Sequence, residues 1–206
     1  MPQKDHWEQV YATKSATGVS WFQEHAEQSL RLIQDTGVPL SAAIIDVGGG
    51  ASTLVDDLLA GGYRALSVLD ISAAALKSPQ ARLGAAADQV RWLVGDITTL
   101  DLPTQAFDVW HDRAVFHFLM APEHREAYVR QVLRAVKPGG HVIVSTFAED
   151  GPLQCSGLPV MRYSADGLHA EFGAPFELVR HEQEEHRTPA GGIQKFVYCY
   201  CRMHAV

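Results

Sequence analysis

The chain has 206 residues, about the size of one typical domain, with 47% hydrophobic and 20% charged residues. This composition excludes a disordered chain, and no run of about 18 apolar residues that would span a membrane occurs. The formal charge of −7 argues against the phosphate contacts of a nucleic-acid binder. The first residues do not resemble a secretory signal, and three cysteines cannot form a disulfide framework. We therefore expect a cytoplasmic protein of one domain, residues 1–206, with a small or neutral partner.

The first 37 residues are predicted to form two helices. Asp5 can cap a short helix whose Trp7, Val10 and Tyr11 share one face. A second helix is expected to begin at Ser20, with a glutamine three residues later, and to end near residue 37. We expect residues 1–37 to form a helical cap on a core of residues 38–206.

From about residue 42, apolar strands alternate with helices. Strands are predicted at 42–47, 65–72, 90–97, 107–112 and 141–147, and the intervening helices at 52–62, 73–84 and 122–136. Such alternation is typical of βαβ units in a parallel, doubly wound sheet. After a short helix near 164–172, segments 176–186 and 193–203 are joined by a short turn, which predicts an antiparallel hairpin. The predicted fold class is a single α/β domain with seven strands.

Glycines and carboxylates follow the first three predicted strands. Asp46 and three successive glycines, Gly48, Gly49 and Gly50, come after the first strand, and Asp70 and Asp96 end the next two. Open parallel sheets bind ligands beyond the carboxyl ends of their strands, and glycines let the backbone approach a ligand closely. The spacing indicates a nucleoside site, although a tight turn without a ligand is the simpler reading of the glycines alone.

The residues around the glycines favour a nucleoside that carries an ammonium group over a dinucleotide. A dinucleotide motif needs a small residue at the sixth position, where this chain has Thr53. Asp46 would repel a pyrophosphate but suits a ligand that carries an ammonium group. S-adenosylmethionine combines adenosine with such a group. A nicotinamide-dependent oxidoreductase is the alternative enzyme class.

Five segments resemble the successive motifs of class I, seven-strand S-adenosylmethionine-dependent methyltransferases. They are IIDVGGGAS, SVLDIS, VGDI, FDVWHDRAVFHFL and LRAVKPGGHVIVSTF, within a resemblance that covers residues 38–206. The resemblance implies that Asp46 and the glycines hold the methionine end, that Asp70 accepts the ribose hydroxyls, and that Ile71 packs on the adenine. The implied cofactor-binding residues are Asp46, Gly48, Gly49, Gly50, Asp70, Ile71, Asp96, Ile97 and His111.

The acceptor side follows the fourth predicted strand. His111, Asp112 and Arg113 stand where this family places residues that face the sulfonium and the acceptor, and similar Asp-Arg pairs occur in thiopurine-type methyltransferases. Asp112 and Arg113 could instead form an ion pair that orients the loop. His117 is a candidate general base, or a packed histidine with one hydrogen bond.

Aromatic residues of the cap and one cysteine complete the candidate acceptor pocket. Trp7, Tyr11, Trp21 and Phe22 could form a lid, or they could simply pack two helices onto the core. Cys155 lies in the loop after the fifth predicted strand, where an acceptor could pass.

The histidines and cysteines are also candidate metal ligands. Together with Cys199 and Cys201, Cys155 could bind a soft metalloid, although two small strand residues and one loop cysteine without a shared role are the simpler reading. The histidines of HEQEEH lack the helical spacing of a zinc site, so no metal is predicted.

The predicted function is methyl transfer from S-adenosylmethionine to a small-molecule acceptor. The absence of a clear general-base motif favours a thiol or another soft nucleophile, which needs little help to lose its proton. The alternatives are a protein (lysine) methyltransferase and a non-catalytic S-adenosylmethionine-binding module.

Overall fold

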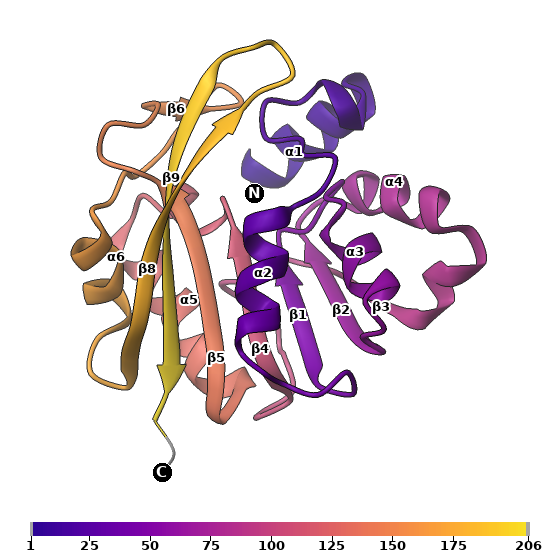
Figure 1. The fold of residues 1–206 in the computed structure, drawn as a ribbon. Helices are drawn as coiled ribbons and strands as arrows, with labels where there is room; N and C mark the ends of the chain where they lie inside the picture. The colour runs from indigo at the N-terminus through magenta and orange to yellow at the C-terminus, as the bar shows by residue number, and fades with distance from the viewer. Residues whose placement is uncertain (1, 205–206) are drawn as a thin grey trace.

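The computed structural model describes residues 2–204 and centres on a seven-stranded sheet of order β3-β2-β1-β4-β5-β9-β8 (Figure 1). The strands are β1 (Ala43–Val47), β2 (Ala65–Asp70), β3 (Val90–Val94), β4 (Phe107–Arg113), β5 (Val136–Phe147), β8 (Phe176–Arg187) and β9 (Ile193–Met203). Strands β1 to β5 run parallel, and β9 is antiparallel to both of its neighbours. The predicted α/β fold class is confirmed.

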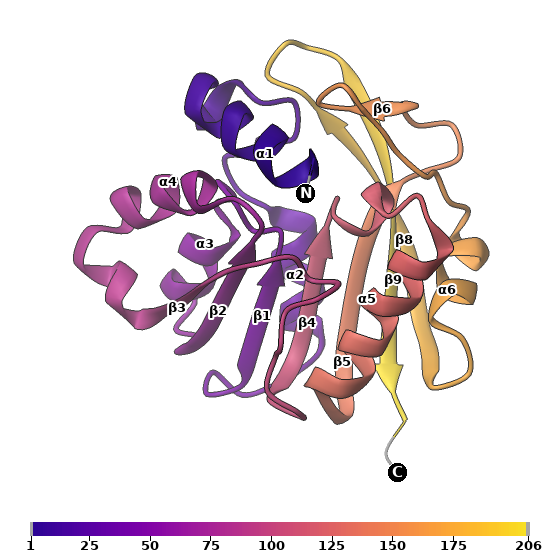
Figure 2. The same cartoon turned by 180° about the vertical axis from the view of Figure 1, so that it is seen from behind.

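Helices cover both faces of the sheet, as Figures 1 and 2 show from opposite sides. They are α1 (Pro2–Thr13), α2 (Glu27–Asp35), α3 (Leu54–Ala60), α4 (Ala73–Leu83), α5 (Pro122–Ala135) and α6 (Ala165–Phe172). Residues of α2, α3 and α4 share one hydrophobic core cluster, and those of α5 and α6 share the other. Helix α1 packs beside α4, above the carboxyl ends of the parallel strands (Figure 1).

Short elements complete the chain. Three 3-10 turns lie at Ala16–Gly18, Gly84–Gln89 and Phe116–Phe118. A small hairpin of β6 (Gln154–Cys155) and β7 (Leu158–Pro159) interrupts the loop between β5 and α6. No helix within residues 2–204 is long and apolar enough to cross a membrane.

Strand β1 shows why the sheet forms where the sequence predicts it. Ile44, Ile45 and Val47 are at most 1% exposed, as expected for a parallel strand that is covered on both faces. Four hydrophobic positions in five residues leave no polar face, so the strand can lie only inside the sheet. The parallel strands therefore end at one edge, where their polar residues meet.

The cap differs from its prediction. The first helix begins at Pro2, which places Asp5 in its first turn, and the second begins at Glu27 instead of Ser20. Tertiary contacts explain the later start, because the Ser20 carbonyl lies 2.8 Å from Nε2 of His186 and the Gln23 carbonyl accepts from Thr53. These carbonyls bond to distant residues and not to the next helical turn.

Candidate functional site

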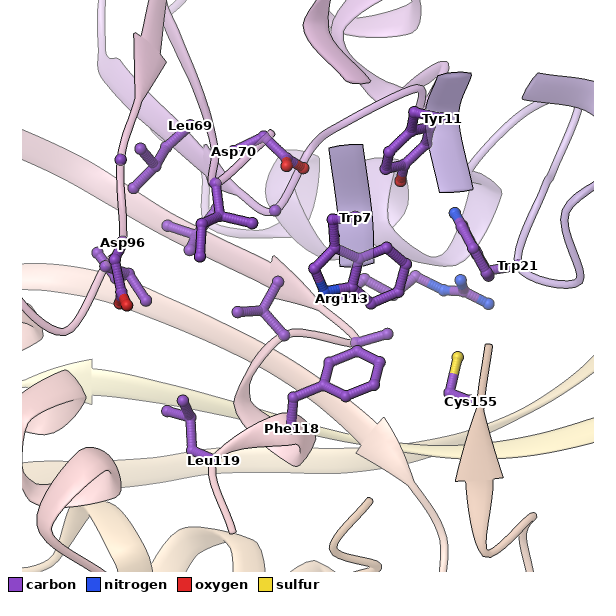
Figure 3. Close-up of a pocket in the computed structure, with 17 residues that line it drawn as sticks. Trp7, Tyr11, Trp21, Leu69, Asp70, Asp96, Arg113, Phe118, Leu119 and Cys155 are labelled. Atoms are coloured by element: carbon purple, nitrogen blue, oxygen red, sulfur yellow. The ribbon is translucent and has the colours of Figure 1, made fainter. Parts of the chain in front are cut away.

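A cavity opens at the carboxyl ends of the parallel strands, beside α1 (Figure 3). It holds about 780 Å³ of empty space, part of which is open to solvent. Of the residues predicted for the site, its lining includes Trp7, Tyr11, Trp21, Gly48, Asp70, Ile71, Asp96, Ile97, Arg113 and Cys155. The structure thus brings together ten predicted residues from seven separate stretches of the chain.

The glycine-rich turn after β1 has a backbone that only glycine accommodates. Gly48 has φ +70°, and a Cβ there would stand 1.9 Å from Cγ2 of Val115. Gly50 has φ +40°, and its Cβ would meet the Tyr11 hydroxyl at 2.8 Å and Oδ2 of Asp70 at 2.9 Å. Positive φ and the close neighbours both exclude larger residues. The turn therefore leaves its backbone bare where α1 and β2 approach it.

Two carboxylates stand at the ends of neighbouring strands and line the cavity. Asp70 is 7% exposed and accepts a 2.8 Å hydrogen bond from the Ser72 amide. Burial raises the pKa of Asp70 to about 7, and the charge of Asp46 adds to this effect. Asp96 accepts from the amide and hydroxyl of Thr98. Both carboxylates could still accept hydrogen bonds from a ligand's hydroxyl or amino groups.

A second cavity of about 520 Å³ shares Trp21, Gly48 and Arg113 with the first. Its lining includes four other predicted residues, Phe22, Asp46, Gly49 and His111. Nδ1 of His111 lies 2.7 Å from Oδ1 of Asp46, and both side chains are buried. Nε2 of His111 has no hydrogen-bond partner among the described residues. Asp46 is thus paired with His111, which was predicted to lie near the acceptor.

Asp112 lines neither cavity. Its carboxylate is fully buried and accepts hydrogen bonds from the amides of Val115 and Phe116 and from the hydroxyl of Tyr128, at 2.8, 3.1 and 2.6 Å. Burial raises the pKa of Asp112 to about 7. These contacts hold the loop after β4, which then carries Val115 against the glycine-rich turn.

Arg113 reaches the cavities from the face of β4 opposite to Asp112. It forms an ion pair with Glu184 and also bonds to Tyr198. The alternative prediction of an Asp112–Arg113 ion pair is therefore wrong, because successive residues of a strand point to opposite faces. Glu184 was not predicted for the site, since its position depends on how β8 pairs with β9.

His117 is packed inside the core and lines neither cavity. Its ring lies against those of Phe118 and Phe147, with centroids 4.5 and 4.8 Å away. Nδ1 can accept a long hydrogen bond from the Phe147 amide at 3.4 Å. Burial lowers the pKa of His117 to about 3. This environment matches the packed histidine that was one of the two readings of the sequence.

Aromatic rings, one of them from α1, form one wall of the first cavity. The Trp7 ring lies edge-on to Trp21 and Phe118, with centroids 5.6 and 5.2 Å away, and Figure 3 shows Trp7 above Phe118 and beside Trp21. Glu8 anchors this helix, because its carboxylate accepts from the amides of Ala73 and Ala74 at the start of α4. The sequence did not single out Phe118 or Glu8.

The three cysteines do not form one cluster. Sγ of Cys199 lies 3.1 Å from Sγ of Cys201, in the core beneath α5 and α6. Cys155 lies in the other core cluster and faces the first cavity. Across residues 2–204, no three His, Cys, Asp or Glu side chains come together as metal ligands. The metalloid hypothesis for the three thiols is therefore wrong.

Comparison with known proteins agrees with this fold. A model described as a methyltransferase domain matches residues 44–140. The chain is 24% identical to human (Homo sapiens) EEF1A lysine methyltransferase 2 over 200 residues, which cover 90% of this chain and 77% of that protein. It spans only 20% of a longer relative, the eEF1A lysine and N-terminal methyltransferase of Mus musculus.

Two solved structures have similar folds. A protein studied for the conversion of a disulfide bond into a thioacetal group during echinomycin biosynthesis aligns over 98% of this chain and 92% of its own, with TM-score 0.80 and 17% identity. The 1,6-didemethyltoxoflavin-N1-methyltransferase of Burkholderia thailandensis, solved with S-adenosylhomocysteine, aligns over 98% and 84%, with TM-score 0.67 and 19% identity.

The sheet order, the glycine-rich turn and the two strand-end carboxylates are typical of α/β folds that bind a nucleoside at the carboxyl ends of their strands. The chain contains a methyltransferase domain at residues 44–140 and resembles the class I S-adenosylmethionine-dependent methyltransferases in sequence and fold, which supports S-adenosylmethionine as its cofactor.

Proposed function

We propose that the protein methylates a small molecule whose acceptor atom is already nucleophilic near neutral pH, such as a thiolate. The observation that carries this proposal is that the described lining of the first cavity has no histidine or lysine, and that its two carboxylates, Asp70 and Asp96, are assigned to the cofactor. Asp112 and His117 lie outside this cavity, and His111 is paired with Asp46 in the second cavity. Tyr11 has a pKa well above its ordinary value because it is buried near Asp70. A thiolate needs no base, since it attacks without losing a proton.

The residues around the first cavity fit the cofactor. Asp70 would accept the ribose hydroxyls, Asp96 and Ile97 would meet the adenine edge, and Ile71 would pack on its face. The bare backbone of Gly48 leaves room for the methionine end. When bound, the cofactor supplies a methyl carbon activated by its sulfonium.

The chain's own contribution is then to position the acceptor and exclude water. Trp7, Trp21 and Phe118 offer apolar surfaces that would hold an acceptor and displace solvent. Correct alignment of two reactants is a major source of rate enhancement in such displacements. Neither role requires a proton-transfer residue.

Transfer of a labelled methyl group tests the proposal. The protein is incubated with S-adenosylmethionine labelled in the methyl group and with a panel of thiols, phenols, amines and small carboxylates. We expect label in one or more thiols, with a rate that follows the thiolate fraction as pH rises. Label in phenols or amines but in no thiol would contradict the proposed acceptor class.

A protein lysine is the second candidate acceptor, and it is favoured by the similarity to EEF1A lysine methyltransferase 2. The same labelled cofactor can be added to a cell lysate that has been separated into protein and low-molecular-mass fractions. Label in a protein band, lost after substitution of its lysine, with none in the small-molecule fraction, would establish this second function. Label in the small-molecule fraction alone would support the first.

A further inference from the structure

Arg113 occupies the junction between the two cavities. It is the only lysine or arginine among the described residues that line either of them. Figure 3 shows its guanidinium between Trp21 and Cys155. A cation with only about 10% of its side chain exposed costs free energy to bury unless partners compensate its charge.

The partners of Arg113 hold one edge of the guanidinium. Nε lies 3.3 Å from Oε2 of Glu184 and 3.2 Å from the Tyr198 hydroxyl, and Nη2 lies 3.2 Å from the same Glu184 oxygen. The guanidinium carbon is 4.1 Å from the centroid of the Phe196 ring, which fixes the plane of the group. Arg113 is therefore held in one orientation before any ligand binds.

The opposite edge of the guanidinium is unused. Nη1 makes no hydrogen bond with any residue in the range 2–204. The negative charge of Glu184 is shared, because its carboxylate also accepts from Tyr198 at 3.0 Å and from Gln23 at 2.5 Å. Arg113 thus keeps two N–H donors and part of its positive charge for a ligand.

We propose that Arg113 binds a carboxylate through Nη1 at the junction of the two cavities. A guanidinium matches the planar geometry of a carboxylate, and the partly buried setting strengthens such a hydrogen bond. A monoanion is favoured over a phosphate dianion because the carboxylates of Asp46 and Asp70 also line these cavities and would repel the second charge. The carboxylate belongs either to the amino-acid end of the cofactor or to the methyl acceptor, and the acceptor case rests on the proposed function.

Two pairs of probes distinguish these sources. S-adenosylhomocysteine carries the amino-acid carboxylate, whereas methylthioadenosine lacks it. The acceptor pair is 3-mercaptobenzoate and thiophenol, measured with the cofactor product bound. Binding is followed by calorimetry and by the fluorescence of Trp7 and Trp21, which line the first cavity. Neither readout requires turnover.

The test variant combines Arg113→Gln with Glu184→Gln, which removes both charges of the buried ion pair. The matched control is Glu184→Gln alone, which keeps Arg113. The double variant should weaken one carboxylate probe by about tenfold or more, because a charge-assisted hydrogen bond is lost. Its partner without a carboxylate should change by less than about twofold. The probe that responds identifies the source.

Equal changes within both pairs would overturn the proposal. If the double variant does not fold, Arg113→Lys keeps the charge but loses the planar fork, and it should weaken the same probe selectively. Failure of the proposed function gives a different result, namely no labelled methyl on either thiol, while the cofactor pair still reports on Arg113.

Discussion

Tyr128 donates a 2.6 Å hydrogen bond to Oδ2 of Asp112 and accepts one of 2.9 Å from the indole of Trp110. Helix α5 is thereby joined to the end of β4, directly behind the site. Asp112 receives three donors, two of them backbone amides. Asp112 therefore stabilises the loop after β4, and it lies on the side of β4 that faces away from the cavities.

This arrangement predicts that Asp112→Asn mainly lowers stability. An amide in place of the carboxylate would face at least one of the three donors with its own NH2 group, so about 1–3 kcal/mol of unfolding free energy should be lost. Turnover per folded molecule should change little. Urea unfolding and steady-state kinetics on the folded fraction measure the two effects. A tenfold loss of kcat/KM with unchanged stability would show that Asp112 acts on the acceptor or the sulfonium.

Asp70 is predicted to contribute directly to cofactor affinity. Asp70→Ala should weaken S-adenosylmethionine binding by roughly 1.5–3 kcal/mol through the loss of charged hydrogen bonds. Calorimetry measures this change, with Asp101→Ala as a control, because Asp101 is exposed and lies outside both cavities. Equal affinities of the Asp70 variant and the wild type would exclude the proposed ribose contact.

The same carboxylate gives the site a pH dependence. The pKa of Asp70 is raised to about 7, so the ionised acceptor of hydrogen bonds is lost as pH falls from about 8 to 6, and cofactor affinity should fall with it. The sign for the free protein is opposite. An unfolded aspartate ionises near 3.9, so the stabilising contribution is complete below that pH and is lost as pH rises through about 7. Both trends should be weaker in Asp70→Asn.

The alternation of strands and helices along the sequence, together with the topology of parallel sheets, made much of this architecture predictable. Continuous apolar strands that alternate with helices can form only a covered parallel sheet, which brings the ends of β1, β2 and β3 together. Successive residues of a strand point to opposite faces, so Asp112 and Arg113 of β4 were expected to lie apart. The prediction that grouped the two residues did not take this into account. Glu184 was not predictable, because it meets Arg113 from 71 residues away through strand pairing. The irregular backbone at Ser20 likewise depends on a carbonyl contact with His186.

Gly48 is predicted to tolerate no side chain. Its φ of +70° and the 1.9 Å separation that an added Cβ would have from Val115 are separate obstacles. Gly48→Ala should cost about 1–3 kcal/mol of stability for each of strain and overpacking. Adding Val115→Ala removes the steric clash but leaves the backbone strain. The double variant should therefore be more stable than Gly48→Ala and less stable than Val115→Ala alone. Thermal unfolding of the three variants tests this, and a Gly48→Ala protein as stable as wild type would refute it.

Glu8 is predicted to hold α1 against the core. Its carboxylate accepts from the first two amides of α4 at 2.7 and 3.2 Å, where the helix dipole favours a negative charge. Glu8→Ala should weaken this contact by about 0.5–1 kcal/mol and speed hydrogen exchange in α1 about two- to fivefold. Glu24→Ala is the control, since Glu24 is exposed outside α1. Equal exchange in both variants would mean that aromatic packing alone holds the helix.

His117 is predicted to be structural, and its pH behaviour separates that role from general-base catalysis. With a folded-state pKa near 3 against an ordinary value of about 6.5, buried His117 stays neutral while the unfolded chain takes up a proton. Its stabilising contribution is therefore complete above about pH 6.5 and is lost as pH falls toward 3.

His117→Asn should accordingly lower stability at pH 7 and also reduce the further loss between pH 7 and 5. The dependence of kcat/KM on pH should keep its shape, because the ring lines neither cavity and cannot reach an acceptor proton. His124→Asn is the matched control, since His124 is exposed on α5. Urea unfolding at several pH values and a pH series of initial rates supply both measurements. Loss of an ionisation near neutral pH from the rate profile of His117→Asn, but not of His124→Asn, would make His117 the base and reopen the choice between thiol, hydroxyl and amine acceptors.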